Sequence, residues 1–155
     1  MALIEQWLRD RLINDPTLNE LLGEPDSQPR IYPVWAPQAD SDRILYPYVV
    51  FMRIGTNRQY CSGSDGNESD GAPKVLFHVN CFDKDYFNVK LVEDAVRYAI
   101  DGARTPQGVN GFQVLSAFIR NEYDIPEPVD VGDEFPIFAV QFEVEIIHTE
   151  KVPIN

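Results

Sequence analysis

The sequence predicts an α+β fold: a mainly antiparallel sheet of four to five strands, with an N-terminal helix pair and one long helix packed on it. Three observations lead to this prediction. Two amphipathic helical patterns open the chain, most later segments have strand patterns, and one long helical pattern interrupts the strands. Strands that follow one another without a crossover helix pair antiparallel, which is typical of a sheet with helices on one face.

The first helical pattern covers residues 3–12, where apolar residues recur at the spacing of one helix face. Asn14, Asp15 and Pro16 end it. Asp15 is then expected to cap a short second helix, with Pro16 at its first position and Gly23 just past its end. The chain therefore opens with two helices.

The first strands are expected between residues 31 and 82. Because proline cannot donate a ladder hydrogen bond, the apolar run at 31–35 in a proline-rich region is predicted to be an edge strand or an extended cover. Residues 48–54 are rich in β-branched and aromatic side chains and predict a central strand. A turn-rich loop at 61–73 leads to a second strand at 75–82, so the pair forms a hairpin with a long tip.

The long helix follows this hairpin. Asp83 or Asp85 can cap it, and it runs to about Asp101 with Gly102 closing it. A turn then leads to a strand from Phe112 to about Ile119.

The last strand has an unbroken period of two, so one face is buried and the other carries charge. Its apolar residues are Phe138, Val140, Phe142, Val144 and Ile146, and the alternating positions hold Ala139, Gln141, Glu143 and Glu145.

Length and charge limit the classes of function. A chain of 155 residues fits one domain, residues 1–155, and can bury enough surface to fold without a disulfide or a metal. The net charge of -12 disfavours a nucleic-acid binder, which needs clustered Lys and Arg to hold phosphates. Such an acidic surface either serves solubility or lets DNA pass without sticking.

The N-terminal residues carry charges where a signal peptide would have an apolar core, and no segment is long and apolar enough to span a membrane. We therefore expect a cytoplasmic protein whose cysteines, Cys61 and Cys81, stay reduced. They lack the paired spacing of a zinc site and are expected to be small buried hydrophobes.

The stretch LFHVNCFD, residues 76–83, raises the question of a hydrolase because it holds His78, Cys81 and Asp83. Side chains of a strand point alternately to opposite faces, so His78 and Cys81, an odd number of residues apart, cannot meet. Asp83 shares the face of Cys81 and can equally cap the next helix. His148 is expected to be a polar residue at a strand end. The sequence thus predicts no catalytic residue.

Two acidic segments are candidates for metal sites. The loop that starts at Asp65 matches a calcium loop at its first, third and fifth positions, but Asp70 replaces the required glycine and Leu76 the bidentate glutamate. The segment 121–134 holds six acidic residues in no known ligand frame, and a solvated linker is the default reading. No metal or cofactor is therefore expected, and partner contacts are the alternative. The predicted contact residues are Asp65, Glu68, Asp70, Glu127, Asp130 and Asp133.

Several short motifs, taken in order, carry a resemblance to a known family. They are MALIE, the segment Asp15 to Gly23 (DPTLNELLG), Arg30 to Pro33 (RIYP), Ala36 to Gln38 (APQ), Pro47 to Phe51 (PYVVF), the run VLFHVNCF and the helix ending at Asp101-Gly102. The chain resembles the tail completion or tail terminator family of long-tailed bacteriophages and prophages over nearly its whole length. It departs from the family in its longer loop at residues 61–73 and its acidic segment after Asn121.

This resemblance implies a structural virion protein without catalytic residues, assembled in the host cytoplasm. It implies a homo-oligomeric ring, of six copies, that caps the head-proximal end of the tail tube, ends tube polymerisation and joins the tail to the head connector protein. Genomic DNA would pass through the lumen without specific binding. We expect Gln141, Glu143 and Glu145 to face or rim this channel, where carboxylates would repel phosphates.

The sequence is also compatible with other functions. A head-tail connector adaptor, or another minor tail ring component, would also form a ring with a lumen. A small hydrolase built on Cys81 or His78 and an acidic DNA mimic are the remaining classes.

Overall fold

The computed structural model describes residues 4–23, 28–34, 45–57, 60–61, 68–71, 73–104, 113–126 and 136–153. The helices in this part of the chain are α1 (Ile4–Ile13), α2 (Pro16–Leu22) and α3 (Tyr86–Ile100). The strands are β1 (Ile31–Pro33), β2 (Tyr48–Asn57), β3 (Tyr60–Cys61), β4 (Glu68–Gly71), β5 (Lys74–Asp83), β6 (Val114–Pro126), β7 (Phe138–His148) and β8 (Glu150–Pro153).

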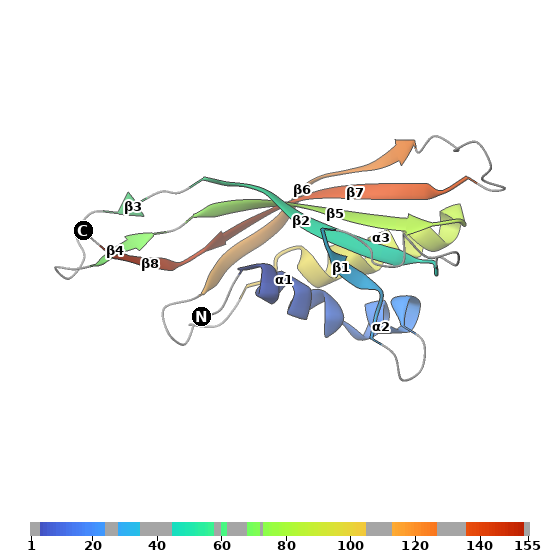
Figure 1. Cartoon of the computed structure of the whole chain (residues 1–155), viewed down its shortest axis with the longest axis horizontal. Helices are drawn as coiled ribbons and strands as arrows, with labels where there is room; N and C mark the ends of the chain where they lie inside the picture. The colour runs from blue at the N-terminus through green and yellow to red at the C-terminus, as the bar shows by residue number, and fades with distance from the viewer. Residues whose placement is uncertain are drawn as a thin grey trace.

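The main sheet has five strands in the order β1-β2-β5-β7-β6. β1 runs parallel to β2, and the other three pairs are antiparallel. The three helices lie on one side of this sheet (Figure 1). The predicted α+β class, with a mainly antiparallel sheet and helices on one face, is therefore confirmed.

The N-terminal helix pair forms where its caps predict. The carboxylate of Asp15 accepts a hydrogen bond from the backbone N–H of Leu18 at 3.0 Å, and Pro16 occupies the first turn of α2, where its missing N–H costs no helix bond. The backbone N–H of Gly23 closes the helix on the carbonyl of Asn19. Leu8 of α1 and Leu18 of α2 are fully buried, so both helices attach to the core by their apolar stripes.

Asp85, rather than Asp83, caps α3. Its carboxylate accepts from the backbone N–H of Asn88 at 3.0 Å. Asp83 instead accepts from the backbone N–H of Lys84 at 2.6 Å, which fixes the turn between β5 and the helix. At the other end Gly102 has a φ of +75°, a conformation that glycine adopts without a steric penalty, and the chain turns toward β6.

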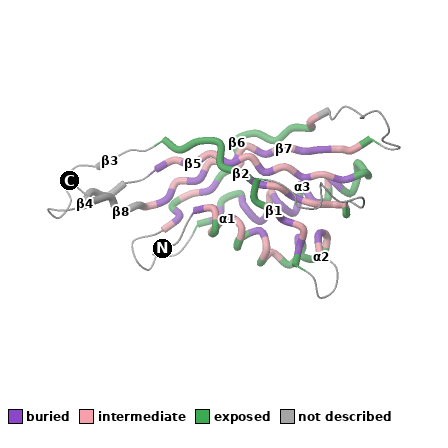
Figure 2. Tube along the Cα trace, viewed as in Figure 1, coloured by how far each residue is buried: buried purple, intermediate pink, exposed green. Residues whose placement is uncertain are grey.

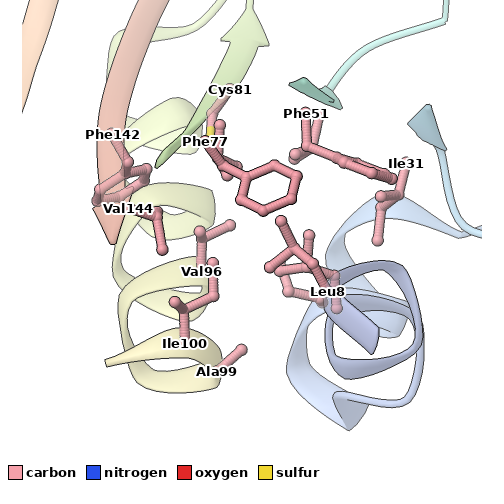
Figure 3. Close-up of a cluster of buried hydrophobic side chains, with 14 of the residues drawn as sticks. Leu8, Ile31, Phe51, Phe77, Cys81, Val96, Ala99, Ile100, Phe142 and Val144 are labelled. Carbon is pink, nitrogen blue, oxygen red and sulfur yellow. The ribbon is translucent and has the colours of Figure 1, made fainter. Parts of the chain in front are cut away.

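The hydrophobic core lies between the helices and one face of the sheet. Phe77 on β5 and Phe142 on β7 point toward Val96 and Ile100 of α3, with Leu8 of α1 nearby (Figure 3). Along β5, and along β7 from Val140 onward, every second residue is buried and its neighbour is only half-buried, which gives the alternating colours of Figure 2. The other sheet face therefore lies outside the core.

Three elements differ from the sequence-based expectation. β2 and β6 extend to Asn57 and Pro126, beyond the predicted ends at residues 54 and about 119. Part of the predicted loop at 61–73 is strand, because β4 pairs with both β3 and β8 in a small second sheet. Such long-range backbone pairing leaves little trace in a run rich in glycine, serine and acidic residues.

Candidate functional site

The residues of the LFHVNCFD stretch do not form a catalytic site. Cys81 is fully buried on the helix side of β5, and burial raises the pKa of its thiol, with a further contribution from the charge of Glu93. His78 lies on the other face, where its Nε2 atom is 3.8 Å from Oε1 of Glu143 on β7. A buried neutral thiol without a base is a poor nucleophile, so this arrangement does not support a cysteine hydrolase.

Asp83 and His148 are both buried at strand ends, where their side chains contact the backbone. Asp83 is buried at the end of β5, where burial raises the pKa of its carboxyl and its Oδ1 accepts hydrogen bonds from two backbone N–H groups. His148, at the end of β7, is also buried, and its Nδ1 lies 2.9 Å from the carbonyl oxygen of Thr149. The prediction that His148 ends a strand is confirmed, although burial of its ring was not foreseen.

No group of three or more His, Cys, Asp or Glu side chains capable of holding a metal ion occurs in the described part of the chain. Among the same residues, no helix is long and apolar enough to cross a bilayer.

The sheet face opposite the helices is the candidate functional surface, called here the open face. Gln141, Glu143 and Glu145 of β7 lie on it side by side with partners from both neighbouring strands. Tyr123 Oη donates to Gln141 Oε1 at 3.1 Å, and Asn121 Nδ2 donates to Glu143 Oε2 at 2.9 Å. The three residues therefore share one face as predicted, and each is held by a neighbour from an adjacent strand. Their position relative to a channel stays a prediction.

Glu145 binds two cations at once. Its Oε2 is 2.8 Å from Nη1 of Arg120 on β6, and its Oε1 is 3.6 Å from Nζ of Lys74 on β5. With His78 beside Glu143, each basic side chain that the described strands place on this face has a carboxylate partner. The basic groups on the open face are thus paired with carboxylates, and the face is not freely acidic. The sequence did not reveal these partners, since they depend on the register of three strands.

The start of the acidic segment after Asn121 is part of the fold, which corrects the expectation of a solvated linker there. Glu122 and Asp124 lie on β6 and point toward α3. Arg97 binds Glu122 through two nitrogens, at 2.7 and 3.0 Å, and Lys90 binds Asp124. The basic residues on one side of α3 were the sequence signal for these ion pairs, but whether they contact β6 depends on tertiary packing.

These ion pairs change the acidity of the groups involved. The hydrogen bond from Arg97 holds the pKa of Glu122 below its usual value, and the hydrogen bond from Lys90 does the same for Asp124. Glu93 of α3, which contacts both cations, has a raised pKa because it is buried. The cluster of Lys90, Glu93, Arg97, Glu122 and Asp124 joins α3 to the second half of β6, and we call it the α3–β6 ion cluster.

The predicted partner-contact residues are only partly placed. Glu68 and Asp70 belong to β4, within the small second sheet. Asp65, Glu127, Asp130 and Asp133 lie outside the described residues. Their role in partner contacts stays a prediction.

Exposed apolar side chains lie on α3 and near both edges of the main sheet. On β2 they are Met52 and Ile54, and on β6 they are Leu115, Phe118 and Tyr123. The second half of β2 and much of β6 are exposed in Figure 2. Such residues on edge strands are unusual for an isolated domain and typical of an interaction surface.

Comparison with known proteins gives a likeness at the level of the fold. No protein-family model matches the chain, and no curated protein sequence matches it. Among solved structures, the chain is similar to a chain in the structure titled "Virion of native gene transfer agent (GTA) particle", with a TM-score of 0.62 and 13% sequence identity. The likeness covers 92% of this chain and 92% of that chain. At this identity the two proteins share an overall fold from end to end.

Proposed function

We propose that the protein is a structural component of a phage-like virion and acts as a tail terminator. Copies form a closed ring, of six subunits, at the head-proximal end of the tail tube, where the ring stops tube growth and joins the tail to the head connector. The observation that carries this proposal is the end-to-end likeness to a chain of a gene transfer agent virion, which agrees with the motif order of the sequence.

The side chains of the fold support an assembly role rather than catalysis. The one thiol that the structure places in the core is buried, and His78 lies on the opposite face of the sheet. Apolar side chains are exposed along both sheet edges, where a neighbouring subunit can cover them. Rings arise from head-to-tail interfaces whose rotation closes, and a sheet with two unlike edges suits that geometry.

The open face suits the lining of a channel for DNA. Phosphates bind proteins through free Lys and Arg side chains. Lys74 and Arg120 are both held by Glu145, so neither is free to bind a phosphate. The net charge of -12 adds a general repulsion. DNA could therefore slide along this face without being retained.

Multi-angle light scattering and negative-stain electron microscopy test the proposal. The purified protein, alone and mixed with tail tubes from the same phage or prophage, is expected to give rings or ring-capped tubes. A monomer that stays monomeric with authentic tubes would contradict a ring function. Binding to the isolated head connector, without binding to tubes, would instead indicate a connector adaptor.

A further inference from the structure

One edge of the main sheet is open along the second half of β2. β1 pairs with β2 only from Val49 to Phe51. Val34, with a φ of +63°, donates the last hydrogen bond that the structure describes at this edge, to the carbonyl of Phe51 at 2.7 Å. Among the described residues, nothing pairs with the outer edge of residues 52–57, and a hollow of about 390 Å³, lined in part by Val34 and Met52, lies beside it.

The opposite edge is open along the second half of β6. In the first half, the backbone N–H of Gly102 donates to the carbonyl of Ala117 at 2.8 Å, and the carboxylate of Asp101 accepts from the N–H of Ile119 at 3.1 Å. The α3–β6 connection therefore closes that part of the edge. Within the described chain, residues 121–126 have a strand partner on one side only, which is β7.

We propose that residues 121–126 of β6 pair with residues 52–57 of β2 in a second copy of this chain. Repeated head to tail, this pairing closes the copies into a ring with the open face inside and the helices outside. The inference rests on the ring function proposed above and names the two strands that join its subunits.

The strand directions fit this pairing. β2, β5, β7 and β6 alternate in direction across the sheet. The copies of a ring are related by rotation about its axis, and when that axis runs roughly along the strands, each strand keeps its direction from copy to copy. Because β2 and β6 run in opposite directions, β6 of one copy and β2 of the next are antiparallel. The alternation then continues across every subunit boundary, and no edge remains unpaired.

The positions of the two open stretches along the sheet also fit. Residues that are aligned across neighbouring strands form a row. Tyr123, near the middle of the β6 stretch, lies in the same row as Asn80 of β5. Gly55, near the middle of the β2 stretch, lies in the same row as Leu76 of β5. These rows are separated by roughly 13 Å along β5, and four strands are roughly 19 Å wide. Joining the stretches shifts each copy by roughly 13 Å along the strands for every roughly 19 Å of sheet width. This shift tilts the strands by roughly 35° from the ring axis, which lies in the range of closed barrels.

The direction of this offset agrees with the handedness of sheets. The β5–α3–β6 connection joins parallel strands, and such crossovers are right-handed. Seen from the helix side with β2 pointing up, β2 then lies to the right of β6. The fixed hand of sheet twist makes barrel strands rise to the right when seen from outside, so the copy on the right is displaced upward. Its lower, open half of β6 comes beside the upper, open half of β2.

The side chains are complementary in this arrangement. Tyr123 comes opposite Gly55 on the open face, where a Cβ added to Gly55 would meet no atom within 4 Å, leaving space for the ring. Arg53, whose side chain is 47% exposed and whose partner among the described residues is Glu5 at 3.1 Å, comes near the acidic Asp124 on the helix side. Opposite charges on neighbouring strands favour pairing.

Disulfide trapping tests the pairing directly. Gly55→Cys and Tyr123→Cys are combined in a Cys61→Ser background, and the protein is oxidised mildly in the presence of tail tubes. We expect covalent multimers up to the full ring on a non-reducing gel, which disappear on reduction. The matched control combines Gly55→Cys with Leu115→Cys, in the closed half of β6, and should give at least ten-fold less cross-linking.

A charge reversal gives a second measurement. Arg53→Glu should reduce ring formation at least ten-fold, whereas Lys84→Glu, at an exposed position away from both edges, should leave it unchanged. Rings that form normally without the Gly55–Tyr123 cross-link, or that tolerate Arg53→Glu fully, would overturn the strand pairing and leave the ring function intact. Absence of any ring from the unmodified protein with authentic tubes would overturn the ring function itself.

Discussion

Arg97 on α3 binds Glu122 on β6 in a two-point ion pair, with Nη2–Oε2 and Nε–Oε1 distances of 2.7 and 3.0 Å. The two residues are 25 positions apart and belong to the two elements whose connection closes half of the β6 edge. A planar guanidinium held at two points fixes orientation as well as distance. The pair thus keeps the second half of β6 in line with the sheet, where a neighbouring subunit would meet it.

Arg97→Met tests this role. Loss of the guanidinium removes the cation that forms an ion pair with Glu122 and one of the two cations that bind Glu93. Because the pair is about one third exposed, we expect a loss of about 1 kcal/mol in the free energy of unfolding, measured by urea denaturation. Arg104→Met changes the same charge at an exposed site outside the α3–β6 ion cluster and should change the free energy of unfolding by less than about 0.5 kcal/mol.

The pH dependence of stability should reveal the Lys90–Asp124 pair. The pKa of Asp124 is lowered in the folded protein, so its stabilising effect is present above the unfolded pKa of about 3.9 and is lost as the pH falls through the folded value. Asp124→Asn should therefore destabilise the protein at pH 6 and match the wild type near pH 2. Asp10→Asn, on exposed α1 surface, is the control. Equal destabilisation at both pH values would show that the charge of Asp124 does not stabilise the folded protein.

Cys81 should behave as a buried core residue. We expect its thiol to resist iodoacetamide in the folded protein and to react after denaturation, because it is fully buried and its pKa is raised. Cys81→Ala should cost about 1 to 2 kcal/mol of stability through a small cavity and leave ring formation intact. Peptide mapping by mass spectrometry separates Cys81 from Cys61. Ring assembly that fails in a folded Cys81→Ala variant would show a role beyond packing.

Glu145 should keep the open face from holding DNA. Glu145→Gln removes the carboxylate shared by Lys74 and Arg120 and leaves two cations free to bind phosphates. We expect several-fold tighter binding to duplex DNA of random sequence at low salt, measured by fluorescence anisotropy and weakened by added salt. Glu20→Gln on the exposed side of α2 changes the same charge and should not alter DNA binding. Equal binding by both variants would argue against the open face as the contact surface.

Sequence patterns predicted the parts of the fold that depend on local chemistry. Asp15 and Asp85 cap their helices, and the alternation along β7 identified its buried face correctly. The reach of β6 to Pro126 was missed because Glu122 and Asp124 disfavour a strand locally and are stabilised there by α3. Their partners are more than 20 residues away, and no local pattern carries that information.

The candidate site was predicted only in part, because its residues follow a local pattern whereas their partners come from other strands. Alternation placed Gln141, Glu143 and Glu145 on one face, since the period of a strand is fixed. The cations that pair with Glu145 come from β5 and β6, and the register of those strands is set by hydrophobic burial across the whole sheet. Charge-paired and freely acidic surfaces therefore look alike in the sequence.

The most direct test of the tail-terminator function is the length of tail tubes assembled in vitro from the cognate tube protein. Adding this protein during assembly is expected to halt elongation, shorten the mean tube length in proportion to its concentration, and leave a ring at one end of each tube in negative-stain images. Tubes that grow to the same length with and without the protein, and that carry no ring at either end, would contradict the account.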